Sequence, residues 1–172
     1  SPLDQMIGGH LLENSHGETY VVEKHFAREH QHGRVGLLAT ATLRVLAAWA
    51  GDSRLAEYQA NKFAFLDIET TGLSGGTGTY AFLIGVARFE EHEFHLEQFF
   101  MRDPAEEPAQ LIALEEFLAP CRALVTFNGK SFDAPLVNTR YLVHGWRSPL
   151  LDMGHIDLLH LARRLWRGRI PS

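Results

Sequence analysis

The sequence predicts an α/β protein with a mixed sheet, in which an antiparallel three-strand meander is joined by parallel strands and flanked by helices. Three consecutive strand patterns, at residues 62–69, 79–90 and 92–101, are separated by short connections, as in a meander. The short, continuously apolar segment RALVTFNG, residues 122–129, is typical of a buried parallel strand. Helical patterns lie on both sides of this segment, so we expect helices to cover the sheet.

The second half of the chain carries three helical patterns, at residues 103–121, 131–145 and 153–166. In the last of these, Asp157 lies early, where it fits either a first-turn acid or an N-cap.

The first third of the chain precedes the meander. Residues 9–33 suggest a β-hairpin with its turn at Asn14 to Gly17, and residues 34–60 have apolar side chains at helical spacing. We therefore expect an N-terminal extension, residues 1–61, made of a β-hairpin and a helix. It would pack on a core formed by residues 62–172.

Composition limits the class of protein. The 172 residues suit one domain with a full core, and 45% hydrophobic with 22% charged residues is ordinary for a globular protein. No apolar run approaches the roughly 18 to 20 residues that span a bilayer, and the first residues lack the features of a signal peptide. The single cysteine, Cys121, excludes an internal disulfide and favours a reducing compartment, so we expect a cytoplasmic protein without a membrane partner.

The net charge of −5 argues against nucleic-acid binding driven by the phosphate backbone alone. However, residues 1–121 hold 8 Lys and Arg against 18 Asp and Glu, whereas residues 122–172 hold 8 against 3. The basic last third could follow a phosphate backbone or simply form a solvated helix face. The chain does not begin with Met and stops at RIPS directly after a helical pattern, as expected of a domain cut from a longer chain.

Two acidic residues, Asp67 and Glu69, end the apolar strand FAFLDIE, where an unpaired buried charge would be costly. Side chains alternate along a strand, so both point to the same side, about 6.5–7 Å apart along it. Like charges this close repel unless a cation lies between them, and oxygen ligands favour Mg²⁺ or Mn²⁺. Alternatively, either acid caps the following loop, because an isolated D-x-E is common by chance.

A third acid, Asp133, lies near the start of the helix that follows the buried strand. Ligands gather at the carboxyl ends of strands in open α/β sheets, so we expect Asp67 and Asp133 to approach each other from neighbouring strands. Together with Glu69 they would place three carboxylates in one cleft. The alternative is that Asp133 is only a helix N-terminal acid favoured by the helix dipole.

Three segments, LDIETTGL, FNGKSFDAPLV and HIDLLHLARRLW, resemble the DEDD 3′–5′ exonucleases of the ribonuclease H-like superfamily, in particular their YprB-like bacterial branch. Asp67 and Glu69 match the first exonuclease motif, and Asn128 and Asp133 match the second. The similarity covers residues 62–167 and implies a ribonuclease H-like form of the mixed sheet.

The resemblance implies a divalent-metal-dependent 3′–5′ exonuclease that hydrolyses phosphodiester bonds of single-stranded nucleic acid with two Mg²⁺ or Mn²⁺ ions. Asp67 would bind both ions, Glu69 one of them, and Asp133 the other, directly or through water. Contacts to the 3′ end of the nucleic acid are expected from Thr70, Thr71, Gly72, Leu73, Asn128, Lys130 and Phe132. Lys130 could equally be an exposed turn residue.

The family's third motif supplies a fourth carboxylate and a Tyr or His base on a later helix. HIDLLHLA resembles the helix that precedes this motif, so we expect the chain to stop short of it and Asp157 to be a cap rather than the fourth ligand. The alternative function is therefore a catalytically deficient ribonuclease H-like module that binds nucleic acid or docks a partner.

Histidines and aromatic residues give weaker signals. His25, His30 and His32 follow neither a zinc spacing with cysteines nor an HExxH pattern, so the sequence predicts no zinc site there. Several aromatic residues have spacings more typical of core packing than of base stacking, namely Phe99, Phe100, Trp146 and Trp166.

Overall fold

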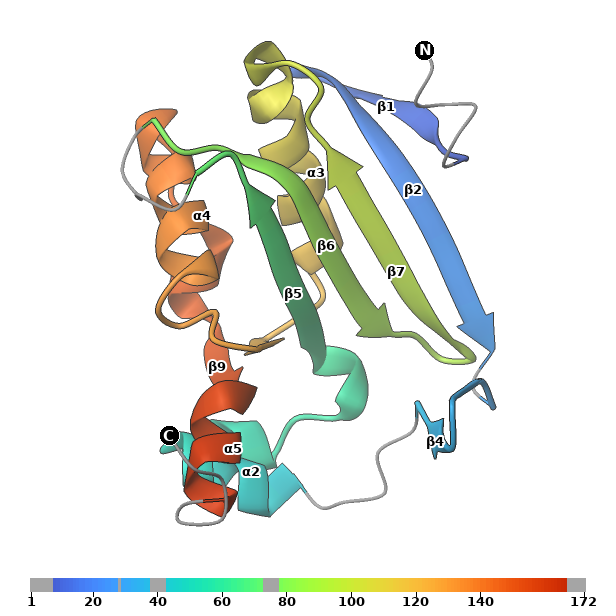
Figure 1. Cartoon of the computed structure of the whole chain (residues 1–172), viewed down its shortest axis with the longest axis vertical. Coiled ribbons are helices and arrows are strands. Elements are labelled where there is room, and N and C mark those ends of the chain that lie inside the picture. Colours follow the sequence, from blue (N-terminus) through green and yellow to red (C-terminus); the bar gives the residue numbers. More distant parts are fainter. Residues whose placement is uncertain (1–7, 28, 38–42, 73–77, 167–172) are drawn as a thin grey trace.

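The computed structural model describes residues 8–27, 29–37, 43–72 and 78–166 of the chain. Seven strands form one sheet in the order β1-β2-β7-β6-β5-β8-β9 (Figure 1). These strands are His10–Asn14 (β1), Gly17–Ala27 (β2), Phe63–Thr70 (β5), Ala81–Phe89 (β6), Glu93–Phe100 (β7), Ala123–Thr126 (β8) and Gly154–Asp157 (β9). A separate pair consists of Gln31–His32 (β3) and Val35–Gly36 (β4).

The pairing confirms the predicted mixed sheet. β5, β6 and β7 pair antiparallel in chain order, as in a meander, and β5, β8 and β9 pair parallel. In the parallel part Phe65 lies beside Val125, and Val125 beside Ile156. The carboxyl ends of β5, β8 and β9 therefore reach the same edge of the sheet, where the segments that follow them can meet.

Helices cover both faces of the sheet. The helices are Leu43–Ala50 (α2), Glu107–Leu118 (α3), Asp133–Val143 (α4) and Leu158–Leu165 (α5), with short 3₁₀ turns at Ser53–Ala56 (η1), Ala60–Lys62 (η2), Pro104–Glu106 (η3) and Pro149–Asp152 (η4). Figure 1 shows α3 behind β6 and β7, and α2 with α5 near the C-terminus. No helix within the described ranges is long and apolar enough to cross a membrane.

Alternation along β5 divides the core into two clusters. Ala64 and Leu66 pack with residues of α3 and α4, whereas Phe63 packs with residues of α2, η1 and α5. Asp67 and Glu69 lie on the same side of β5 as Phe63, but beyond the apolar cluster on that side. The same strand thus closes both cores and carries two acids beyond one of them.

A buried ion pair fixes α4 against α3. Glu107 accepts hydrogen bonds from Nε and Nη2 of Arg140, both at 2.6 Å, and each residue is 2% exposed. The Glu107 carboxylate also lies 2.7 Å from Nε2 of His144. Because each buried charge depends on its partner, this contact fixes the last turn of α4 against the start of α3.

β1 and β2 form a hairpin whose turn lies between Asn14 and Gly17. β2 then pairs antiparallel with β7, from Tyr20 opposite Phe100 to Ala27 opposite Glu93, so the hairpin adds two strands to the edge of the same sheet. The helical pattern of residues 34–60 extends further than the observed helix.

Helix α2 covers only residues 43–50 of that pattern, and Gly51, with φ of +75°, follows its last residue. β4 occupies residues 35–36, and residues 38–42 lie outside the described part of the chain. A left-handed glycine after the last helical residue is a common way to end a helix.

The helix predicted over residues 153–166 is wrong in its first part, because residues 154–157 form β9 and α5 begins only at Leu158. A Cβ on Gly154 would lie 2.5 Å from Cδ2 of Leu55, and Ile156 is buried. A short apolar run does not distinguish a strand from a helix. Here the segment forms a strand because it pairs in parallel with β8, which is distant in sequence.

Candidate active site

β5 carries Asp67 and Glu69 at its carboxyl end, on either side of the half-buried Ile68. Both acidic side chains are exposed, so the prediction that this pair is buried at an energetic cost is wrong. The register of β5 with β6 shifts between Glu69 and Thr70, which is a bulge of the kind that re-aims side chains at the end of a strand. The alternation along β5 leaves both carboxylates on the side opposite Ile68.

Threonines make the hydrogen bonds of the segment that follows the acid pair. Thr70 Oγ1 donates to the Gly72 carbonyl at 3.0 Å, and Thr71 Oγ1 accepts from the Tyr80 backbone N–H at 3.1 Å. Within the described residues, neither acid of β5 caps this loop. Leu73 lies outside the described residues.

The loop between β8 and α4 has an unusual backbone. Asn128 has φ of +67°, and no other non-glycine residue in the described ranges has a positive φ. Such a conformation is strained for most side chains, and asparagine tolerates it best. At the next position, a Cβ on Gly129 would lie 2.5 Å from the Thr126 side chain, so the turn requires glycine there.

Asp157, at the end of β9, holds this loop in place. Its carboxylate accepts hydrogen bonds from the backbone N–H groups of Asn128 at 2.9 Å, Lys130 at 3.0 Å and Leu159 at 3.0 Å. The bond from Leu159 makes Asp157 the N-cap of α5, which confirms the cap predicted from the sequence. The two bonds to the β8–α4 loop could not be predicted, because they join segments that only the parallel pairing of β8 and β9 brings together.

The charge of Asp157 is stabilised although the side chain is 3% exposed. Burial opposes the charged form, but the N–H donors of Lys130, Asn128 and Leu159 outweigh it and hold the pKa of Asp157 below its usual range. A carboxylate with three backbone donors already satisfied is a positioning residue for the loop. This arrangement fits a cap better than a fourth metal ligand.

Asp133 is the first residue of α4 and is 9% exposed. Burial raises its pKa to about 6, and the negative charges of Asp67, Asp157 and Glu69 add to the effect. Asp133 therefore lies near enough to Asp67 and Glu69 for their charges to act on it. Among the described residues, however, these acids do not place three ligand atoms within 4.8 Å of one another.

A cleft of about 600 Å³ lies between β5 and α4. Glu69, Asp133 and Asn128 give it a polar side, and Phe127 and Phe132 give it an aromatic one. Both phenylalanines are strongly exposed, at 62% and 60%. Because both exposed rings line the same cleft, they are candidates for contact with a ligand.

The remaining predicted contacts divide between the cleft and its surroundings. Thr70 and Gly72 line the cleft, whereas Asp67, Thr71 and the exposed Lys130 lie outside its lining. Sequence reasoning missed Phe127, although its position directly before Asn128 at the end of a buried strand was an available signal. Phe99, by contrast, is fully buried, as its strand spacing predicted, whereas Trp166 is 48% exposed, so the core prediction is wrong for Trp166.

Comparison with known proteins identifies the superfamily of the chain. The model of the RNase_H superfamily matches residues 64–172, so the chain belongs to the RNase H superfamily. The chain is also 43% identical over 116 residues to the uncharacterized protein YprB of Bacillus subtilis (strain 168). That match covers 66% of this chain and 27% of YprB, so the chain spans about a quarter of this relative's length. Superfamily membership makes hydrolysis of nucleic acid the expected type of reaction.

Replacing Asp157 tests its role as the anchor of the β8–α4 loop. We expect Asp157→Ala to lower the free energy of unfolding by about 2–3 kcal/mol at pH 7, because it removes a helix cap and leaves two further N–H groups unpaired. Because the pKa is lowered in the folded state, this contribution is complete above the unfolded pKa and is lost as the pH falls through the folded pKa. Urea unfolding at several pH values measures both effects.

Asp103→Ala is the matched control, since Asp103 is an exposed aspartate that caps η3 through one N–H of Ala105. Its loss should cost about 1 kcal/mol. Amide hydrogen exchange at Asn128 and Lys130 should accelerate in Asp157→Ala alone. Equal losses in the two variants, with unchanged exchange in the loop, would show that Asp157 is only a cap.

Asp133 is expected to destabilise the metal-free protein. Its pKa is raised on folding, so the folded state binds the proton more tightly and stability falls as the pH rises from about 4 through 6. In EDTA, Asp133→Asn should therefore raise the free energy of unfolding by about 1–2 kcal/mol at pH 8, and the gain should fade toward pH 4. Urea unfolding of both proteins across this range measures it, with the exposed Asp152→Asn as control. A loss of stability in Asp133→Asn at pH 8 would contradict the predicted repulsion.

Proposed function

We propose that this domain is a divalent-metal-dependent 3′–5′ exonuclease that hydrolyses phosphodiester bonds of single-stranded nucleic acid. One observation carries the proposal: a buried acid on α4, Asp133, is held within electrostatic reach of the acid pair on β5, at the edge of a cleft. Like charges gathered at one edge of the sheet destabilise the folded state, and folding itself does not require them there. A cation supplied on binding would remove it.

The donor set fits hard cations. Asp67, Glu69 and Asp133 offer only carboxylate oxygens, which suit Mg²⁺ or Mn²⁺ better than softer ions. Two such ions would polarise the scissile phosphate, activate water and stabilise the leaving 3′-oxygen. Asp67 would contribute to both ions, Glu69 to one and Asp133 to the other. Asp157 would act indirectly, by fixing the loop from which α4 and Asp133 start.

The walls of the cleft favour an unpaired strand end. The exposed rings of Phe127 and Phe132 can stack on bases only where those bases are not already stacked in a duplex. Thr70 and Gly72 line the cleft beside Glu69, and we assign them to the terminal nucleotide. Lys130 is exposed next to this cleft, and its charge would suit an approaching phosphate.

Degradation of a 5′-labelled single strand, with DNA and RNA in parallel, tests the proposal. With Mn²⁺ the chain should shorten the strand from its 3′ end, and EDTA should stop the reaction. Asp67→Asn should slow it by about 100-fold or more, because stabilisation by the bound metal is worth several kcal/mol. Asp152→Asn, an exposed acid outside the cleft, serves as the matched control and should leave the rate unchanged.

A second readout separates hydrolysis from binding. Phe132→Ala should weaken binding of a short single strand by about 1–3 kcal/mol, as expected for one lost stacking contact. Binding that depends on Phe132 without any metal-dependent shortening would contradict the exonuclease and leave a nucleic-acid-binding module. Degradation that persists in Asp67→Asn would contradict the assignment of the site.

A further inference from the structure

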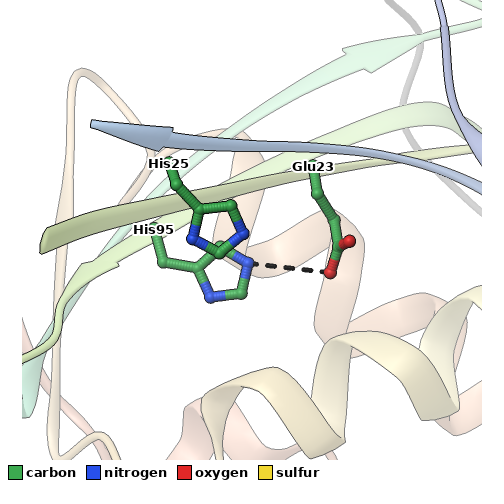
Figure 2. A group of neighbouring side chains, drawn as sticks. All are labelled: Glu23, His25 and His95. Atoms are coloured by element: carbon green, nitrogen blue, oxygen red, sulfur yellow. Dashed lines mark ion pairs between the residues drawn. The ribbon is translucent and has the colours of Figure 1, made fainter. Parts of the chain in front are cut away.

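A second group of potential metal ligands lies away from the acidic cleft, on the strands that join the hairpin to the core. Glu23 and His25 belong to β2, and His95 lies opposite His25 on β7. One ligand atom from each of the three residues lies within 4.8 Å of the others (Figure 2). We call this group the β2–β7 histidine site. Strand β6 separates it from the acids of β5.

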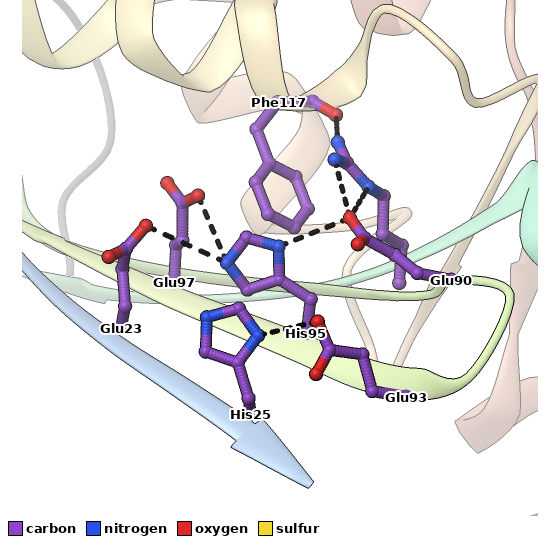
Figure 3. A network of polar contacts seen from close by, with 8 residues as sticks. Glu23, His25, Glu90, Glu93, His95, Glu97 and Phe117 are labelled. Atoms are coloured by element: carbon purple, nitrogen blue, oxygen red, sulfur yellow. Dashed lines mark hydrogen bonds and ion pairs between the residues drawn. The ribbon is translucent and has the colours of Figure 1, made fainter. Parts of the chain in front are cut away.

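Carboxylates hold the far side of both imidazole rings. His25 Nδ1 lies 2.8 Å from Oε1 of Glu93, and His95 Nδ1 lies 3.2 Å from Oε1 of Glu90 (Figure 3). Glu90 is itself held by Arg88, at 2.7 Å and 3.0 Å. A carboxylate can only accept, so Nδ1 is the donor in both contacts, and Nε2 is the ring atom that would bind a cation. Metal-binding histidines are usually oriented in this way.

His95 Nε2 has no hydrogen-bond partner among the described residues, although the side chain is only 8% exposed. Glu97 Oε1 lies 3.3 Å from this nitrogen and Glu23 Oε1 lies 3.8 Å from it. A buried polar atom that makes no hydrogen bond is costly, and here two carboxylates lie beside it. A cation among these atoms would satisfy all of them at once.

The His25 and His95 rings are stacked, with centroids 4.3 Å apart and an interplanar angle of 18°. An imidazole nitrogen binds a metal in the plane of its ring, so one ring must rotate out of this stack before both can bind the same ion. The exposed side chain of His25 has room for that rotation.

We propose that Glu23, His25 and His95 bind a zinc ion. Two imidazole nitrogens with one carboxylate form a ligand set that zinc accepts, with a fourth position open to Glu97 or water, whereas Mg²⁺ prefers oxygen ligands alone. The ligands come from the hairpin and from the core, so zinc would fasten β2 to β7 and stabilise the fold. The site is independent of the proposed exonuclease activity.

The test uses the full chain, stripped with a chelator and titrated with Zn²⁺ by calorimetry. We expect one zinc ion per chain at this site and a rise in the melting temperature when it binds. His25→Ala, whose side chain is exposed and therefore safe to truncate, should weaken zinc binding at least tenfold and abolish the rise. Glu93→Gln, which weakens the carboxylate behind His25, should lower the affinity by about 10–100-fold.

His92→Ala is the matched control, because His92 is exposed in the neighbouring β6–β7 turn and lies outside the site. The Asp67→Asn variant should likewise bind zinc at the β2–β7 histidine site with unchanged affinity. Substitution with Co²⁺ gives a second readout, since visible absorption from a histidine-bound ion should be present in the wild type and absent in His25→Ala. No zinc binding by the wild type, or binding that His25→Ala and His92→Ala affect equally, would overturn the proposal.

Discussion

Parallel pairing of β5, β8 and β9 is the constraint on which the acidic cleft depends. It brings the ends of three strands to one edge of the sheet, although long stretches of chain separate them. Asp157, at the end of β9, then reaches the backbone of the loop after β8. That loop starts α4 with Asp133 beside the acids of β5. Each step is a consequence of strand order, and none requires the acids to attract one another.

At this edge of the sheet, specific contacts hold α4 and the loop before it in place, while neighbouring carboxylates repel one another. Glu107 and Arg140 fix α4 from one side, and Asp157 fixes the preceding loop from the other. Between these supports, Asp133 is buried near other negative charges, and its pKa rises to about 6. Like charges that are held together against repulsion are frequent at functional sites. In this fold the repulsion among carboxylates lies at the proposed site for a divalent cation and a phosphate.

Local patterns were sufficient to predict the meander, the buried strand β8 and the position of Asp133 at the start of a helix. These features depend on side-chain alternation, apolar runs and turn residues, which are visible within a few neighbouring residues. β9 could not be predicted, because its four residues become a strand only through pairing with β8. The exposure of Asp67 and Glu69 was also missed, because an apolar run does not show where the helices that cover it stop.

Functional features built from distant segments were the hardest to predict. His25 looks unremarkable beside His30 and His32, and its relation to His95 exists only through the register of β2 with β7. The sequence pattern D-x-E with a later Asp indicated the acidic cleft, because the resemblance to a known family joined the two parts. No comparable pattern joined the parts of the β2–β7 histidine site, so only the three-dimensional arrangement revealed it.

We propose that Asp67, Glu69 and Asp133 together hold a divalent cation. Paramagnetic Mn²⁺ tests it most directly, because it broadens the NMR signals of nearby amides and so reports where the ion lies. We predict that substoichiometric Mn²⁺ first broadens the amides of Ile68 and Ala134, that EDTA reverses the effect, and that Asp67→Asn removes it. Broadening confined to other parts of the chain, or unchanged broadening in Asp67→Asn, would show that the ion does not bind at these three acids.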